Sequence, residues 1–119
     1  MNYVLSIQTD KNSYYGGSIK ATCVDEADEV AFLILKKLQK EGFKNILSVE
    51  AIDYYNFKGS LPLPENRRLF NNIAYHRLSY DYNVSADFLE GLIKYFENTE
   101  EYEKCSVILK KKRLLFQPA

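Results

Sequence analysis

The chain has 119 residues, and its sixteen lysines and arginines balance sixteen aspartates and glutamates, giving a formal net charge of zero at pH 7. This length predicts one domain over residues 1–119, and the neutral balance argues against a uniformly basic nucleic-acid-binding or membrane-binding surface. A hydrophobic content of 46% and a charged content of 27% are those of a globular chain rather than a disordered, collagen-like or disulfide-scaffold one.

The N-terminal residues do not match a targeting segment, because no basic region precedes an apolar core. No stretch approaches the roughly 18 to 20 apolar residues that a membrane-spanning helix needs. We therefore expect a cytoplasmic location, no membrane partner, and reduced thiols at Cys23 and Cys105. The sequence indicates no cofactor and no metal site.

The first elements are two strands. Residues 3–9 alternate in polarity with a period of two, which is typical of a half-buried strand. Residues 10–17 contain two glycines and several polar residues, a composition typical of a turn. They should close a hairpin onto a second alternating strand over residues 18–24.

A helix is predicted over residues 26–41. Asp25 is a suitable N-cap, acidic residues fill the first turn and lysines fill the last turns, which complements the helix dipole. Gly42 follows as a left-handed residue that ends the helix, with Phe43 placed to pack on Leu38.

Residues 46–54 alternate again and predict a third strand. The next segment, residues 56–69, contains Gly59, Pro62 and Pro64. It reads as a loop of about fourteen residues, longer than most connections in a compact domain. Loops of this length often carry function, so we mark it as a candidate site.

The C-terminal third predicts a strand, a helix and a strand. Alternation over residues 72–82 indicates a long fourth strand, and Ser85 should cap a second helix with one apolar stripe. Residues 98–104 read as an acidic turn or a fraying helix end. Residues 107–116 should form a last strand, with the basic run Lys110–Arg113 in its middle.

In chain order these elements read β-β-α-β-β-α-β, which predicts an α+β ferredoxin-like two-layer sandwich: a mainly antiparallel sheet with two helices on one face. Alternate residues of a strand point to opposite faces of the sheet, and this parity predicts which side chains face the helices. They are Leu5, Ile7, Ile19, Ala21, Leu47, Val49, Leu78, Val107 and Leu109. The same parity assigns another set to an open face: Ser6, Gln8, Lys20, Thr22, Ser48, Glu50, Tyr75, Arg77, Lys110 and Lys112. A one-residue bulge would reverse either assignment.

Catalytic signatures are missing from the sequence. No nucleotide-binding glycine-rich loop, no Gly-x-Ser-x-Gly and no His-Glu-x-x-His occurs. The single histidine, His76, cannot supply a multi-histidine metal site, and its parity favours a structural histidine on the core side over a site residue. We therefore predict a protein that is not an enzyme.

Ten tyrosines and seven phenylalanines, without tryptophan, suit either sheet packing or a binding surface. Several of these aromatic residues, together with arginines, fall in predicted connections, where packing in the core explains them less well. We predict that they bind a protein partner, in an inhibitor, immunity-type or regulatory role; the residues are Tyr14, Tyr15, Tyr54, Tyr55, Phe57, Arg67 and Arg68. The open sheet face could also pair two copies in a homodimer.

Single-stranded nucleic-acid binding is the alternative function. It needs a basic and aromatic patch on the open sheet face, made by Lys20, Tyr75, Arg77, Lys110 and Lys112. Against it, lysines also protect sheet edges from aggregation, and no strand carries the recognition pattern of RNA-binding domains.

Overall fold

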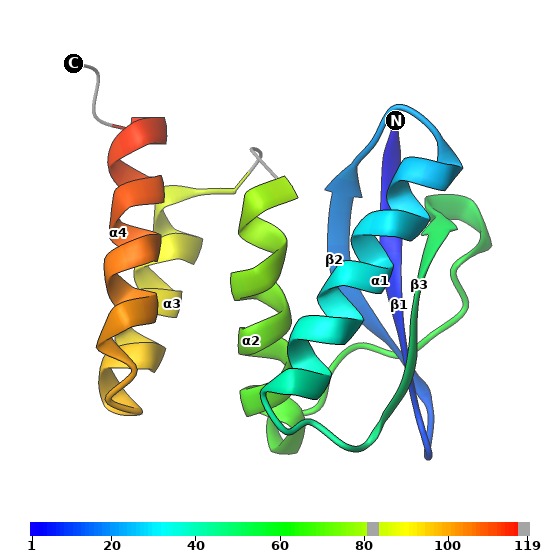
Figure 1. The fold of residues 1–119 in the computed structure, drawn as a ribbon, viewed down its shortest axis with the longest axis horizontal. Coiled ribbons are helices and arrows are strands. Elements are labelled where there is room, and N and C mark those ends of the chain that lie inside the picture. The colour runs from blue at the N-terminus through cyan, green and yellow to red at the C-terminus, as the bar shows by residue number, and fades with distance from the viewer. Residues whose placement is uncertain (81–83, 117–119) are drawn as a thin grey trace. The chain divides into compact units, whose positions relative to one another are not determined.

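A computed structural model describes residues 1–80 and 84–116 of the chain, which divides into two compact units, Met1–Asp81 and Tyr82–Ala119 (Figure 1). The described residues form an α+β fold with one three-stranded antiparallel sheet and four α-helices. None of the helices in these ranges has the length and apolar character needed to cross a membrane. The expectation of a single domain over 1–119 stays a prediction.

The sheet lies in the N-terminal unit and has the order β2-β1-β3. Strand β1 (Asn2–Thr9) pairs antiparallel with β2 (Ser13–Lys20) on one side and with β3 (Ile46–Asp53) on the other. Strand β1 is central, and its residues from Tyr3 to Ile7 are buried, so Ser6 is buried although its parity predicted an open position. The hairpin turn is shorter than predicted, so β2 begins inside the segment expected to be a turn.

Two irregularities change the predicted faces of the outer strands. In β2, Gly16 and Gly17 together oppose Leu5, because Val4 pairs with Ser18 and Ser6 pairs with Tyr15.

In β3, Leu47 is the extra residue, since Gln8 pairs with Ser48 while Thr9 pairs with Ile46. Leu47 was predicted to face the helices, and this is wrong: its side chain is 66% exposed, while Ile46 and Val49 are buried. The bulge accounts for the difference because one added residue reverses the parity beyond it.

Helix α1 (Val24–Lys40) confirms the predicted helix, but it begins two residues earlier and Cys23, not Asp25, is its N-cap. Its end is as predicted. Gly42 has φ +93°, and the N–H of Phe43 donates to the carbonyl oxygen of Leu38 at 3.1 Å. These are the features of a Schellman C-cap, in which a left-handed residue allows the chain to turn back onto the helix.

Helix α2 (Arg67–Arg77) occupies most of the segment predicted as a fourth strand, so that prediction is wrong. The buried positions Ile73, Ala74 and Arg77 have helical spacing, whereas the alternation over residues 72–82 had indicated a period of two. Pro64 opens a short 3-10 turn, Pro64–Asn66, that leads into the helix. Residues 81 and 82, the end of the predicted strand, lie outside the described residues.

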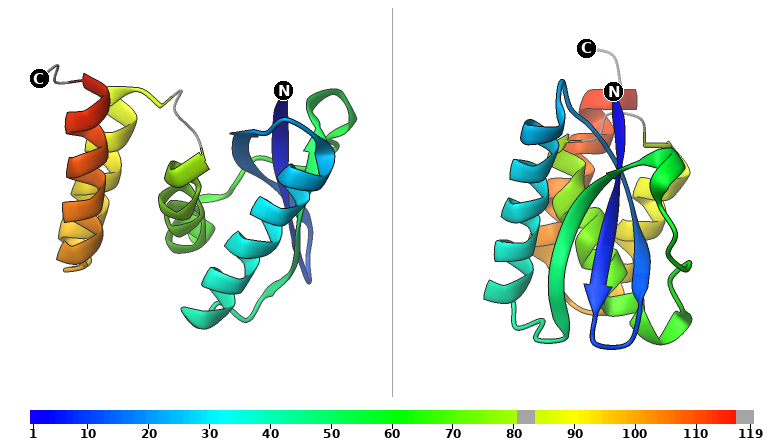
Figure 2. Two further views of the ribbon diagram at one scale, coloured as in Figure 1. Left: turned by 45° about the horizontal axis from the view of Figure 1, so that its top comes forward. Right: turned by 90° about the vertical axis from the view of Figure 1, so that its right-hand side faces the viewer.

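Helices α1 and α2 cover one face of the sheet, with α1 packed against β3 and α2 packed against β2 and α1 (Figures 1 and 2). Leu5, Ile7 and Ile19 of the sheet pack with Ile34 of α1 and Ile73 of α2 in one hydrophobic core. Burying each of these side chains contributes about 1.5 to 3 kcal/mol.

The C-terminal unit is a pair of packed helices, α3 (Ala86–Asn98) and α4 (Tyr102–Phe116). Ser85 caps α3 as predicted, because its Oγ accepts a hydrogen bond from the N–H of Phe88 at 3.1 Å. Glu100, with φ +61°, turns the chain between the helices.

The prediction of a last strand over 107–116 is wrong, because these residues belong to α4. Only Ile108 of this helix is buried, while Val107 and Leu109, which were predicted to face the core, are exposed. With residues 72–77 and 107–116 helical, the predicted ferredoxin-like order of five strands is not formed.

Candidate functional site

The predicted partner-binding residues of β2 are packed rather than free. Tyr14 is buried in the core and makes an edge contact with Phe70, with ring centroids 5.7 Å apart. Tyr15 is half-buried, and its ring packs against Phe57 at 5.8 Å. Both were expected in an exposed turn, but the earlier start of β2 places them in the sheet.

Tyr54 and Tyr55 are presented to solvent at the end of β3. They form a 3-10 turn, Tyr54–Asn56, capped by Asp53, whose Oδ1 accepts a hydrogen bond from the N–H of Tyr55 at 3.1 Å. Their rings make an edge contact at 5.7 Å, yet the two residues remain 66% and 88% exposed.

The chain then runs down beside β2 (Figure 2, right). Ser60 joins it to the edge of that strand through two backbone hydrogen bonds of 2.9 Å, one donated to Ser13 and one accepted from Tyr15. Leu61 and Leu63 lie just beyond this bridge and are 75% and 46% exposed. Residues 54–63, called here the 54–63 segment, therefore hold four large exposed side chains on an anchored piece of chain.

Arg67 and Arg68 lie at the opposite end of the sheet from the two tyrosines. Asp53, beside Tyr54, pairs with Tyr3 near the start of β1, whereas Arg68 lines a cleft with residues at the other end of that strand. A strand of eight residues spans about 26 Å. The structure thus divides the predicted partner-binding set into buried residues, exposed tyrosines, and arginines at the far end.

The predicted basic patch does not form on a sheet face. Lys20 ends β2, but Tyr75 and Arg77 belong to α2, and Lys110 and Lys112 belong to α4 in the other unit. The patch is missing because helices stand where strands were predicted over residues 72–82 and 107–116, and those two strands would have aligned these side chains on one face.

Two members of this patch also have structural contacts. Arg77 is only 9% exposed, and its Nη1 donates to the carbonyl oxygen of Ser18 at 2.9 Å, which connects α2 to β2. Lys112 donates to Glu90 at 2.6 Å. Because of this hydrogen bond, and secondarily the charge of Lys112, the pKa of the Glu90 carboxyl is lowered.

His76 contacts Glu41 through its Nε2, so the single histidine connects α2 to the end of α1. Its partnered, largely buried side chain fits the structural interpretation, although it lies on a helix rather than a strand. Within 1–80 and 84–116, no three histidine, cysteine, aspartate or glutamate side chains are grouped closely enough to hold a metal ion.

Cys23 is an exposed free thiol, while Cys105 donates to the carbonyl oxygen of Ile93 at 3.5 Å. Burial, and then the charge of Glu97, raise the pKa of the Cys105 thiol. A raised pKa leaves less of the reactive thiolate at neutral pH.

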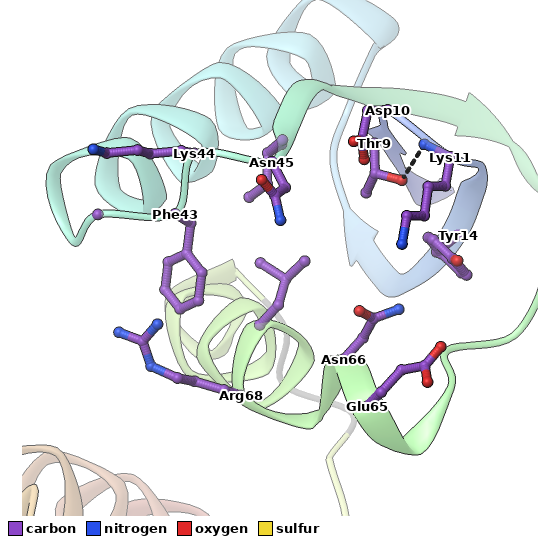
Figure 3. A pocket seen from close by; sticks show the side chains of 13 residues that line it. Thr9, Asp10, Lys11, Tyr14, Phe43, Lys44, Asn45, Glu65, Asn66 and Arg68 are labelled. Carbon is purple, nitrogen blue, oxygen red and sulfur yellow. Dashed lines mark hydrogen bonds between the residues drawn. The ribbon is translucent and has the colours of Figure 1, made fainter.

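A cleft of about 680 Å³ opens where four parts of the N-terminal unit meet: the β1–β2 turn, the start of β2, the link from α1 to β3, and the start of α2 (Figure 3). Tyr14, Phe43, Ile46 and Leu69 supply its apolar lining. The sequence indicated the cleft only indirectly, because Arg68 falls in the segment 56–69 that was marked as a candidate site. That segment was predicted to be a loop throughout, and this is wrong at its end, where residues 67–69 belong to α2. The other walls of the cleft come from turns that no periodicity could bring together.

Comparisons with protein families, with curated proteins and with the solved structures find no match to this chain.

Proposed function

We propose that this protein is a small non-catalytic binder that recognises another protein through the 54–63 segment, in an inhibitory, immunity-type or regulatory role. The exposure of Tyr54, Tyr55, Leu61 and Leu63 on one short stretch carries the proposal. Tyrosine is among the residues that contribute most to protein interfaces.

The attachments of the segment support the same function. Asp53 fixes the tyrosine turn, and Ser60 fixes the chain to β2 before Leu61 and Leu63. A surface held in this way can offer the same shape to a partner in every encounter, as rigid binding sites do.

The test is a capture experiment with the immobilised full chain, in which bound proteins are identified and their stoichiometry is measured after purification. Tyr55→Ser and Leu61→Ser should each lower the affinity of the purified complex by about tenfold or more. Leu114→Ser is the matched control, because Leu114 is similarly exposed but lies on α4. Equal affinity for all variants, or no stoichiometric protein partner, would contradict the proposal.

Nucleic-acid binding is an outcome that the same experiment can reveal. If the captured material is single-stranded nucleic acid, its affinity should fall steeply as salt rises, and it should fall further in Lys110→Gln. That result would replace the protein-binding proposal, since the 54–63 segment contains only one basic residue, Lys58.

A further inference from the structure

Helix α4 buries little of its apolar surface within the chain. It is 15 residues long, and an isolated helix of this length is only marginally stable in water. Helices in proteins therefore depend on packing an apolar face, yet Ile108 is the single buried residue of α4, and several of its large apolar side chains are exposed. Besides α3, against which it packs, the helix has apolar surface for a second packing partner.

Three of the exposed side chains lie in a row along one side of α4. They are Tyr102, Leu109 and Phe116, called here the outer row. A spacing of seven residues is close to two full turns, so the three side chains lie nearly one above another. Each residue turns the helix by about 100°, which points Leu109 about 100° away from the buried Ile108. The outer row therefore occupies the side of the helix next to the one that packs on α3.

The exposed charged side chains of α4 are separated along its length. Glu103 lies in the first turn, whereas Lys110 and Arg113 lie in the second half of the helix. An acidic start and a basic end suit the dipole of α4 itself. They also make the helix complementary to a second α4 that runs in the opposite direction, since Glu103 then meets the basic end. A parallel second copy would instead bring like charges together.

We propose that α4 pairs antiparallel with α4 of a second copy of this chain, about a two-fold axis beside Leu109. Tyr102 and Phe116 are each seven residues from Leu109, so the outer row matches itself. Leu109 contacts Leu109 of the second copy, and Tyr102 packs against Phe116 of the second copy. With a rise of about 1.5 Å per residue, Glu103 lies level to within about 3 Å with Arg113 of the second copy. Because α3 lies on the neighbouring side of α4, two C-terminal units would together form a four-helix bundle.

The test is sedimentation velocity of the full chain at concentrations from about 1 μM to about 1 mM. We expect a monomer–dimer equilibrium with a Kd below about 100 μM. A two-fold pair is closed, so the assembly should stop at the dimer. A monomer at every concentration, or assemblies that keep growing, would overturn the proposal.

Matched substitutions at two leucines locate the interface. Leu109→Glu should raise the Kd by about tenfold or more, since it places two carboxylates beside the two-fold axis. Leu114→Glu adds the same charge to the same helix at a more exposed position, but it should leave the Kd unchanged. The reason is that Leu114 points about 140° away from Leu109. Circular dichroism checks that both variants keep their helices. Equal effects of the two substitutions would contradict an interface at the outer row.

Charge reversal tests the antiparallel direction. Arg113→Glu should raise the Kd by about threefold or more at low salt, because the new carboxylate meets Glu103 of the second copy. Adding Glu103→Lys should restore the affinity, since the pair is then re-formed with its signs exchanged. A double variant that dimerises no better than Arg113→Glu alone would rule out this pairing. These measurements contain no partner protein, so their result does not depend on the 54–63 segment.

Discussion

Gly17 and Arg77 form a contact whose strength can be measured directly. Gly17 has φ +96° in the bulge of β2, and a Cβ at this position would lie 2.5 Å from Arg77 Nε. Gly17→Ala should therefore add backbone strain of about 1 to 2 kcal/mol. It should also displace Arg77 from the carbonyl oxygen of Ser18, and a hydrogen bond to a charged group is worth about 1.5 to 3 kcal/mol. We expect a total loss of about 2.5 to 5 kcal/mol in the free energy of unfolding.

Gly42 provides the matched control. It has a similar φ, +93°, but a Cβ there would meet nothing within 4 Å. Gly42→Ala should therefore cost only the backbone strain, about 1 to 2 kcal/mol.

The assay is urea unfolding followed through the amide signals of the buried strand β1. Combining Gly17→Ala with Arg77→Ala should reduce the cost of the glycine substitution to that of Gly42→Ala, because the crowded side chain is then gone. The reasoning is refuted if Gly17→Ala costs no more than Gly42→Ala, or if its cost is unchanged when Arg77 is removed.

Three further predictions test other parts of the structure. Glu100→Gly should raise the stability of the α3–α4 pair by about 1 kcal/mol in thermal melts, since glycine adopts φ +61° without strain; lower stability would contradict this. Lys112 lowers the folded-state pKa of Glu90, so the wild type should be more stable than Glu90→Gln at neutral pH and should lose this extra stability as the pH falls through the lowered pKa. Thermal melts at several pH values test this, and a stability difference that does not change with pH would contradict it. Leu47→Ser should change the free energy of unfolding in urea by no more than about 0.5 kcal/mol, whereas Ile46→Ala should lower it by about 2 to 5 kcal/mol. The reverse order would mean that the bulge in β3 is wrongly placed.

The elements that were predicted well are those with several agreeing local signals. Helix α1 combines an acidic start, a lysine-rich end, one apolar stripe and Gly42 after it. The structure confirms this helix, although its N-cap is Cys23 rather than Asp25. By contrast, the segment of α2 alternates in polarity while its buried residues Ile73 and Arg77 are four apart. When two periods fit the same residues, only tertiary packing decides between them.

Helix α4 was missed for a different reason. It buries only Ile108, so no apolar stripe marks its buried face, and the apolar residues around the basic run resemble a strand. Lysine, leucine and arginine are good helix formers, and this propensity outweighed the apparent alternation. The candidate site was predictable only in part. The sequence placed Tyr54 and Tyr55 in a connecting segment, and the structure leaves both exposed, whereas the cleft depends on turns that are distant in the sequence.

The two attachments of the 54–63 segment have a consequence for the entropy of binding. Fixing the backbone of one residue costs about 1 to 2 kcal/mol of conformational entropy, and a flexible loop would lose this amount for each residue on meeting a partner. The bond from Tyr55 to Asp53 and the bridge at Ser60 fix much of the segment beforehand. Weakening either attachment would therefore lower the affinity for a partner without changing any side chain that touches it.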